Sequence, residues 1–568
     1  MVGAMTNAPT QRTIDAMCDR FVDDYCGLDP FTATRIGVAG HDDQLGDLSP
    51  AGYTARMALV RDAIRAVEAA TPVDDREAAA RDAFLERHRL DVAMEEAGIA
   101  RCHVSVLSSR LHEIRQVFDL MPTEGHEALA AINARLAAVP EALREYRQTL
   151  MEEAGKGHVV ARRQYAEVAA QVRGWTGQQG QGGDVFAAVV ERCAPHGSLR
   201  EQMTAHATVA TAAFAEFGDF LVEEMVPVGK ERDAVGREHY ALASRYFLGA
   251  EVDLEETYAW GWQELARVHE AIIANCDRIL PGTDLAHVVT TLKADESRVI
   301  HGREKFRDWM QELSDRTLEE LNGTHFDIPE SIRRIECQLA PTNDGGIYYT
   351  GPSEDFTRPG RMWWSVPDGI DQFRPWQQTT TVFHEGAPGH HLQIAQTAYR
   401  KDVLNRWQRL MCWVDGHGEG WAVYAERLME ELGYLDDPAD RLGMLLDSQS
   451  FRAARVIVDI GMHLELEIPR DNPFTFHPGE TWTPSLGREF MGHHCADEPS
   501  VLDFEVKRYL GLPGQALSYK VGERIWLEAR ENVRRAQGDT FDLAEFHRAA
   551  LDLGSLGLDP LRAALARL

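Results

Sequence analysis

The segment TVFHEGAPGHHLQ concentrates residue types that can bind and use a metal ion. Zinc hydrolases of the HExxH type place two histidines four residues apart on one helix, and the glutamate after the first acts as a general base. His384 and Glu385 open such a motif, but Pro388 occupies the fifth position, and the next histidines are His390 and His391. The spacing therefore predicts a variant of this zinc motif, enlarged by a local break.

An unbroken helix would keep these histidines apart. His384 and His390 would point about 120° from each other, and His391 would lie about 10.5 Å along the axis from His384. Either pairing requires the helix to open. The intervening Gly-Ala-Pro-Gly allows this, because proline removes a backbone donor and glycine tolerates unusual dihedral angles. We favour His390 as the second ligand, since Gly389 and His390 reproduce the Gly-His pair that often closes the standard motif; His391 is the alternative.

A third ligand is expected from a nearby helix, with the fourth position left for water. The segment DGHGEGWAVYAERLMEELG has the pattern of an amphipathic helix, and Glu419 at its start lies 34 residues beyond Glu385. We predict that Glu419 completes a single zinc site, with His417 as the competing candidate. An alternative for Glu419 is a solvated carboxylate favoured by the helix dipole.

Helices must position these residues, because helical periodicity dominates the chain. Segments such as 51–70, 128–155 and 198–226 repeat apolar residues every three or four positions. Between residues 334 and 365, short β-branched or aromatic runs are separated by turn residues, which predicts a small antiparallel sheet. The resulting map is a helical N-terminal region, 1–330, followed by a region, 331–568, that combines the small sheet with the helices of the metal motif.

The composition excludes several classes of protein. The chain has 568 residues, and 59 Lys and Arg against 90 Asp and Glu give a net charge of −31 and a pI near 5.1. The electrostatic field of such a negatively charged protein repels phosphate backbones and anionic lipids, so we expect no nucleic-acid or membrane partner. No uncharged apolar run reaches the roughly 18 residues of a membrane helix, and the first residues do not form a secretory signal. The eight scattered cysteines indicate a reduced, cytoplasmic protein.

Several motifs along the chain carry a family resemblance. HEGAPGHHLQ, EGWAVYAE, RAARVIVDIGMH, PGQALSYKVG and FHRAALDLGSLGL resemble the bacterial family called domain of unknown function 885, and the resemblance spans nearly the whole chain. That family in turn resembles the gluzincin metallopeptidases, whose relatives include angiotensin-converting enzyme and dipeptidyl-peptidase III. The latter has one extra residue between its histidines, whereas the present motif has two.

The resemblance implies a mainly α fold: a large helical body split by a deep cleft, with zinc at its floor and the small sheet on one wall. A peptide main chain could then pair with the edge of that sheet, at Tyr348 and Tyr349. The alternative for these tyrosines is a packed hairpin with aromatic cross-strand pairs.

The later motifs supply candidates for the remaining roles. Peptidases of this kind use a Tyr or His from a C-terminal helix to stabilise the oxyanion, and Tyr519 is our first choice and His463 our second. A Tyr519 that instead caps a backbone carbonyl is the structural alternative. Arg508 or Lys520 could hold a substrate carboxylate, although a structural ion pair explains each of them as well.

The sequence therefore predicts a zinc-dependent hydrolase that cleaves peptide bonds in short peptides. A metal-activated water would attack the carbonyl, with Glu385 as the general base. One rival is a zinc amidase that acts on a small acyl-amine. A second rival is a non-catalytic binding protein, in which Pro388 prevents the histidines from converging.

Overall fold

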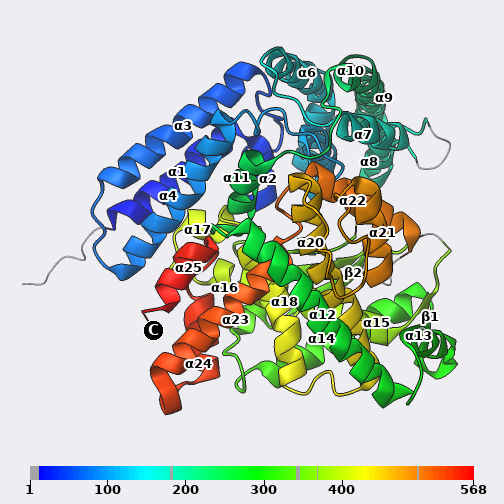
Figure 1. Ribbon diagram of the computed structural model, residues 1–568. Helices are drawn as coiled ribbons and strands as arrows, with labels where there is room; N and C mark the ends of the chain where they lie inside the picture. The colour runs from blue at the N-terminus through cyan, green and yellow to red at the C-terminus, as the bar shows by residue number, and fades with distance from the viewer. Residues whose placement is uncertain (1–11, 179–182, 341–345, 368, 496–497, 568) are drawn as a thin grey trace, which may run out of the picture. The chain divides into compact units, whose positions relative to one another are not determined.

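The computed structural model describes residues 12–178, 183–340, 346–367, 369–495 and 498–567. The chain is 68% helical with a few short strands, which confirms the mainly α fold class (Figure 1). It forms two compact units. The first extends through Val235 and includes Lys507–Leu512, and the second comprises Gly236–Val506 and Pro513–Leu568. The boundary at residue 330, between a helical region and a region that combines the small sheet with the metal motif, stays a prediction.

In the described part of the first unit, the named elements are helices. They are α1 (Thr13–Leu28), α2 (Pro30–Ile36), α3 (Pro50–Ala69), α4 (Asp75–Glu96), α5 (Arg110–Leu120), α6 (His126–Gly155), α7 (Arg162–Trp175), α8 (Val185–Cys193), α9 (Gly197–Phe220), η1 (Leu221–Met225) and α10 (Val226–Val228). Its core contains aromatic pairs between helices, such as the stacked rings of Tyr146 and Phe217, 5.6 Å apart.

The second unit carries the metal motif. Its helices before the motif are α11 (Arg237–Leu248), α12 (Leu254–Ile279), α13 (Leu285–Ala294), η2 (Glu296–Arg298), α14 (Arg303–Leu321) and η3 (Glu330–Ile332). Those that follow are α15 (Pro375–Glu385), α16 (His390–Tyr399), α17 (Arg406–Leu410), α18 (Asp415–Glu431), α19 (Pro438–Gly443), η4 (Met444–Ser450), α20 (Phe451–Leu464), α21 (Pro484–His494), α22 (Pro499–Gly511), α23 (Ser518–Gln537), η5 (Gly538–Thr540), α24 (Leu543–Leu551) and α25 (Leu558–Leu565). The residues of α22 from Lys507 onward belong to the first unit.

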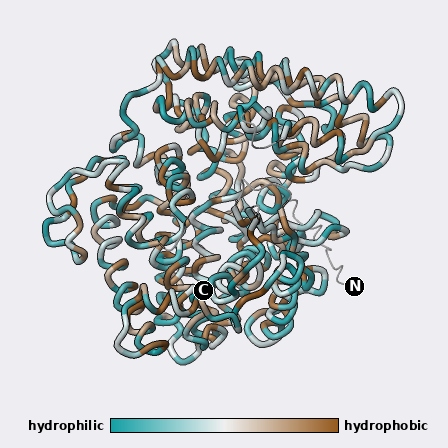
Figure 2. Tube along the Cα trace, turned by 90° about the vertical axis from the view of Figure 1, so that its right-hand side faces the viewer, coloured by the Kyte–Doolittle hydropathy of each residue, from teal (hydrophilic) through white to brown (hydrophobic). Residues whose placement is uncertain are grey.

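Local sequence explains where these helices start and which face they bury. The side chain of Asp253 accepts a hydrogen bond from the Glu256 amide at the start of α12, and Thr483 caps α21 ahead of Pro484. Hydrophobic and hydrophilic residues alternate along many of the helices, as Figure 2 shows, and this gives such helices an apolar stripe to bury. Among the described residues, none of the helices has the length and apolar character of a membrane span.

The predicted small sheet is present in the second unit. Strands β2 (Ile335–Leu339), β3 (Ile347–Thr350) and β4 (Gly360–Trp364) form it in the order β2-β4-β3. β3 and β4 pair antiparallel as expected, whereas β2 runs parallel to β4, with Cys337 opposite Met362. β1 (Ile300–His301) and β5 (Gln372–Phe373) form a separate antiparallel pair. The order leaves β3 at one edge of the sheet.

Candidate metal centre

The two helices that carry the histidines, α15 and α16, are separated by the Gly-Ala-Pro-Gly link. The amide of Gly386 donates to the carbonyl of Val382 at 2.8 Å, and the amide of Gly389 donates to that of Phe383 at 3.1 Å. A Cβ at Gly389 would lie 2.0 Å from the carbonyl oxygen of His384, so the fold-back of the chain requires glycine there. The predicted opening of the helix is confirmed.

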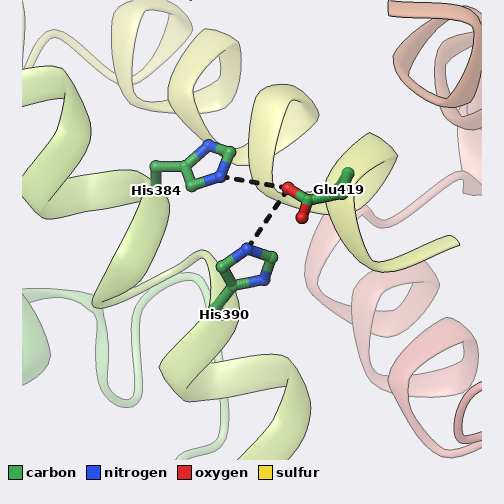
Figure 3. A group of neighbouring side chains, drawn as sticks. All are labelled: His384, His390 and Glu419. Carbon is green, nitrogen blue, oxygen red and sulfur yellow. Dashed lines mark ion pairs between the residues drawn. The ribbon is translucent and has the colours of Figure 1, made fainter. Parts of the chain in front are cut away.

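The opened helix brings two imidazoles to one carboxylate of α18 (Figure 3). The Nε2 atoms of His384 and His390 each lie 3.4 Å from Oε2 of Glu419, and the three ligand atoms lie within 4.8 Å of one another. In a tetrahedral zinc site with bonds of about 2.0–2.2 Å, ligand atoms are about 3.3–3.6 Å apart. The two histidines therefore converge on Glu419 despite Pro388, and both His–Glu separations match the spacing of donors around a shared ion.

The buried carboxylate of Glu419 favours a cation between it and the two imidazoles. Within the described residues its buried Oε2 makes no hydrogen bond of good geometry, although two ring nitrogens lie nearby. Burial would raise the pKa of Glu419, but the imidazoles of His384 and His390 hold this pKa well below its usual range. A buried anionic oxygen needs a compensating charge, and two imidazoles with one carboxylate form a known catalytic zinc ligand set. The three predicted ligands thus fit Zn²⁺ in type, spacing and burial.

His391 has partners of its own. Its Nε2 donates to the carbonyl of Ile332 at 2.8 Å, which leaves Nδ1 to accept from the hydroxyl of Tyr349 at 2.9 Å. Burial lowers the pKa of His391 to about 4, so the ring is neutral at pH 7. Of the two candidate histidines, it is His390 that faces Glu419.

His417, the other candidate for third ligand, points elsewhere. Its Nδ1 contacts the amide nitrogen of Gln393 at 2.9 Å, and its ring packs near Trp526. Burial lowers the pKa of His417 to about 3. The structure therefore groups Glu419, and not His417, with the two ligand histidines.

The orientation of the first imidazole is set by a carboxylate that sequence reasoning missed. Nδ1 of His384 donates to Oε1 of Glu426 at 2.8 Å, and the hydroxyl of Thr380 donates to the other oxygen. This contact fixes the tautomer that presents Nε2 toward Glu419. The signal was available, because a residue seven positions after Glu419 lies on the same helix face.

Burial and neighbouring charges shift the pKa values of His384 and Glu426 in opposite directions. Burial would lower the pKa of His384, but contacts with Glu419 and Glu426 raise it to about 9. Burial would likewise raise the pKa of Glu426, yet Arg452, 3.9 Å away, and His384 lower it. The metal-free centre therefore holds a proton that a cation would replace.

Glu385, the predicted general base, is buried at the C-terminal end of α15. Burial raises its pKa, and its Oε2 has no hydrogen-bond partner in the described part of the chain. A carboxylate in this state is poised to exchange a proton with a group bound beside it.

Close helix packing positions Glu419, the predicted third ligand. α18 and α23 approach through glycines: a Cβ on Gly420 would lie 2.6 Å from the backbone of Gly522, and one on Gly522 would lie 2.3 Å from the Gly416 carbonyl oxygen. The indole of Trp421 also donates to the carbonyl of Pro388 at 2.8 Å. These contacts tie the helix of Glu419 to both the histidine link and α23.

The two oxyanion candidates have different neighbours: Tyr519 of α23 lies near the first turns of α20, and His463 lies at the other end of α20. The guanidinium groups of Arg452 and Arg455 lie 5.4 and 4.8 Å from the ring centroid of Tyr519, and Arg452 is also the neighbour of Glu426. His463 lies eleven residues after Arg452, about 16 Å along the helix, where it is buried near Tyr240. The structure therefore connects Tyr519, rather than His463, to the residues around the metal motif.

Lys520 and Arg508, the residues predicted to hold a substrate carboxylate, have different surroundings. Lys520 is fully buried, and its ammonium contacts Gln449, Glu523 and Glu264. Its charge is therefore matched internally. Arg508 belongs to the segment Lys507–Leu512, which clusters with the first unit and not with the unit that holds the motif.

The two tyrosines of β3 face differently. Tyr348 is 42% exposed and stacks on Trp363 at 6.2 Å, as in the cross-strand alternative. Tyr349 reaches across to His391, so this strand is tied to the start of α16. The substrate roles of both tyrosines stay predictions.

The chain belongs to a bacterial family. Residues 30–565 match the model described as "Bacterial protein of unknown function (DUF885)", which confirms the resemblance drawn from the motifs. No curated protein matches significantly.

Solved structures support the fold. A "putative lipoprotein" from Colwellia psychrerythraea has a TM-score of 0.85 at 20% identity, covering 98% of each chain. A "putative lipoprotein of unknown function" from Shewanella oneidensis has a TM-score of 0.72 at 17% identity, covering 97% of this chain and 99% of that chain. A carboxypeptidase from Pyrococcus furiosus reaches only 0.34 at 12% identity, with 98% and 96% coverage, and that score supports no argument. The likeness to gluzincins and the deep cleft stay predictions.

These comparisons correct one expectation. The two proteins of similar fold are named lipoproteins, which contradicts the cytoplasmic location inferred from the cysteines and the first residues. The scattered positions of the cysteines along the sequence are a weak guide to compartment.

Proposed function

We propose that this chain is a zinc-dependent hydrolase that cleaves amide bonds in short peptides. The observation that carries the proposal is the convergence of His384, His390 and Glu419 on one point, beside the buried carboxylate of Glu385. A purely structural cluster would pair these groups through hydrogen bonds. Here the central carboxylate oxygen sits at ligand spacing instead.

The residues divide the chemistry between them. Bound zinc would polarise the substrate carbonyl and lower the pKa of a water in the fourth position. Glu385 would take the proton of the attacking water and deliver it to the leaving amine, a role that suits a carboxylate with a raised pKa. Glu426 holds His384 in the required tautomer.

Two further elements support a peptide substrate. The guanidinium groups of Arg452 and Arg455 lie over the ring of Tyr519, where their positive charge favours negative charge nearby, and we assign Tyr519 to stabilise the oxyanion. Strand β3 is an edge strand tied to α16 through Tyr349, so an extended peptide could add to the sheet beside the histidines.

The direct test is Glu385→Gln in the full chain. We expect zinc content to stay at one ion per chain while turnover of blocked dipeptides falls by at least about 10³-fold, because the ligands remain and the base is lost. Glu431→Gln, which changes an exposed carboxylate of α18, is the matched control and should keep both. Full activity in Glu385→Gln would refute the general-base role.

Assays should include acylated amines beside the dipeptides. Cleavage of acylated amines alone would move the substrate class from peptides to small amides. A purified chain without stoichiometric zinc by elemental analysis would refute the metal proposal itself.

A further inference from the structure

A large aromatic side chain lies exposed beside the candidate metal centre. Trp413 is 44% exposed, and its ring centroid is 5.9 Å from that of His390. It sits in the short connection between α17 and α18. Single exposed apolar residues are ordinary on protein surfaces, but this one adjoins a proposed zinc ligand, whereas the ligands themselves are largely buried.

The ring of Trp413 is held in place by its surroundings. A Cβ on Gly418 would lie 2.3 Å from Cη2 of the indole, so the edge of the ring rests on the backbone directly before Glu419. The connection is fixed on both sides. The amide of Cys412 donates to the carbonyl of Trp407, and the amide of Gly418 donates to the carbonyl of Val414, both at 2.9 Å. An exposed ring on such a rigid support loses little freedom when it binds another group.

We infer that Trp413 forms one wall of a substrate subsite and selects peptides with an apolar or aromatic side chain next to the scissile bond. This inference rests on the proposed hydrolase function. A substrate amide held at the metal would have its flanking side chain near His390, and the ring of the partly exposed Trp413 lies 5.9 Å from that imidazole. Covering that face with an apolar group removes both surfaces from water, and a ring adds aromatic contact.

The test compares Trp413→Ala and Trp413→Phe with Tyr399→Ala. Tyr399 is a control of similar exposure, 40%, at the far end of α16, about 13 Å along the axis from His390. Substrates are blocked dipeptides that carry Phe, Leu, Ala, Asp or Lys beside the scissile bond. We expect Trp413→Ala to lower kcat/KM at least about tenfold for Phe and Leu peptides through KM, with little change for Ala or Asp. Trp413→Phe should recover part of the loss, and Tyr399→Ala should change nothing.

A binding experiment separates this inference from the hydrolase proposal. Acetohydroxamate and phenylacetohydroxamate both chelate zinc, but only the second adds a ring. Phenylacetohydroxamate should bind the zinc-loaded wild type at least about tenfold more tightly, and Trp413→Ala should lose that advantage while it binds acetohydroxamate normally. This readout needs no turnover.

The outcomes are distinct. Equal losses for all five peptides, a selective loss for Lys peptides, or an unchanged hydroxamate preference in Trp413→Ala would each overturn the apolar subsite. An absence of turnover in the wild type, with the hydroxamate preference intact, would refute the hydrolase proposal alone. A wild type that binds neither zinc nor hydroxamate would overturn both.

Discussion

At the scale of single residues, the arrangement around His384 is the most informative feature of the centre. One ring nitrogen donates to Glu426, so the other faces Glu419 and becomes a lone-pair donor for a cation once its proton leaves. The hydroxyl of Thr380 and the guanidinium of Arg452 in turn stabilise the carboxylate of Glu426. A histidine oriented in this way is prepared for metal binding before any ion arrives.

Glu426→Gln should therefore weaken zinc binding without removing a ligand. An amide cannot accept the imidazole proton as strongly, so we expect the zinc Kd to rise about 10–100-fold, measured by competition with a chromophoric chelator. Glu431→Gln, on the same helix but exposed, should leave the Kd unchanged. An unaltered Kd in Glu426→Gln would show that this carboxylate does not orient the ligand.

Zinc uptake should release a proton. The carboxylates around His384 raise its pKa to about 9, whereas a ligand imidazole must be neutral. Below pH 9 the bound proton competes with zinc, so apparent affinity should fall about tenfold for each pH unit lost. Calorimetry at about pH 8, in buffers of different ionisation enthalpy, should detect close to one proton released from this group. A release that does not change between pH 7 and pH 10 would contradict the assignment.

The raised pKa of His384 also makes the stability of the metal-free protein depend on pH. Because the folded pKa of His384 is raised from 6.5, its contribution to stability is fully present below about pH 6.5. This contribution is lost as the pH rises through about 9.

The candidate site was predictable only in part at this scale. The three candidate ligands could be named because residue type and spacing restrict which side chains can share an ion. Helix spacing places Glu426 on the face of Glu419, but its contact with His384, 42 residues away in sequence, depends on how two helices pack. The position of Trp413 depends on how the chain enters α18, which periodicity does not specify.

At the scale of elements, the break between α15 and α16 makes the site possible. Two helices that meet at a tight link can point their terminal side chains at one place, which a continuous helix cannot do at this spacing. The link is tight enough that Gly389 faces the carbonyl oxygens of His384 and Phe383.

Gly389→Ala should therefore disrupt the centre. The added methyl group would lie 2.0 Å from the carbonyl oxygen of His384, and relief of that clash must displace the start of α16. We expect at least about a 100-fold loss of zinc affinity and about 2–4 kcal/mol of lost stability, read by chelator competition and urea unfolding. The control is Gly174→Ala on α7, where the new methyl group meets nothing within 4 Å; it should change stability by less than about 1 kcal/mol. Normal zinc binding by Gly389→Ala would show that the link tolerates a wider path.

The element types were easier to predict than their pairing. Turn residues between short aromatic runs revealed all three strands of the small sheet, and Gly-Ala-Pro-Gly revealed the break in the helix. The parallel partner of β4 was harder to see, because β2 and β4 have the same local pattern that an antiparallel pair would have. The relative direction of two strands depends on the path of the chain between them, and a local sequence pattern does not determine that path.

At the scale of the whole molecule, the described centre belongs to one compact unit. His384, His390 and Glu419, with their supports Glu426 and Trp421, all lie in the second unit. The first unit has its own hydrophobic core, formed by helices that contain none of the proposed ligands. Metal binding should therefore stabilise the two units unequally.

Hydrogen exchange with and without zinc should reveal this difference. Free energy gained by binding is added to the stability of the structure that forms the site. We expect slower exchange in peptides from α15, α16 and α18 after zinc is added, and unchanged exchange in peptides from α6 and α9 of the first unit. His390→Ala, which removes one ligand, should abolish the protection at equal zinc concentration. Protection that extends equally over α6 and α9, or that persists in His390→Ala, would mean that zinc acts on this chain somewhere other than the centre formed by the opened helix.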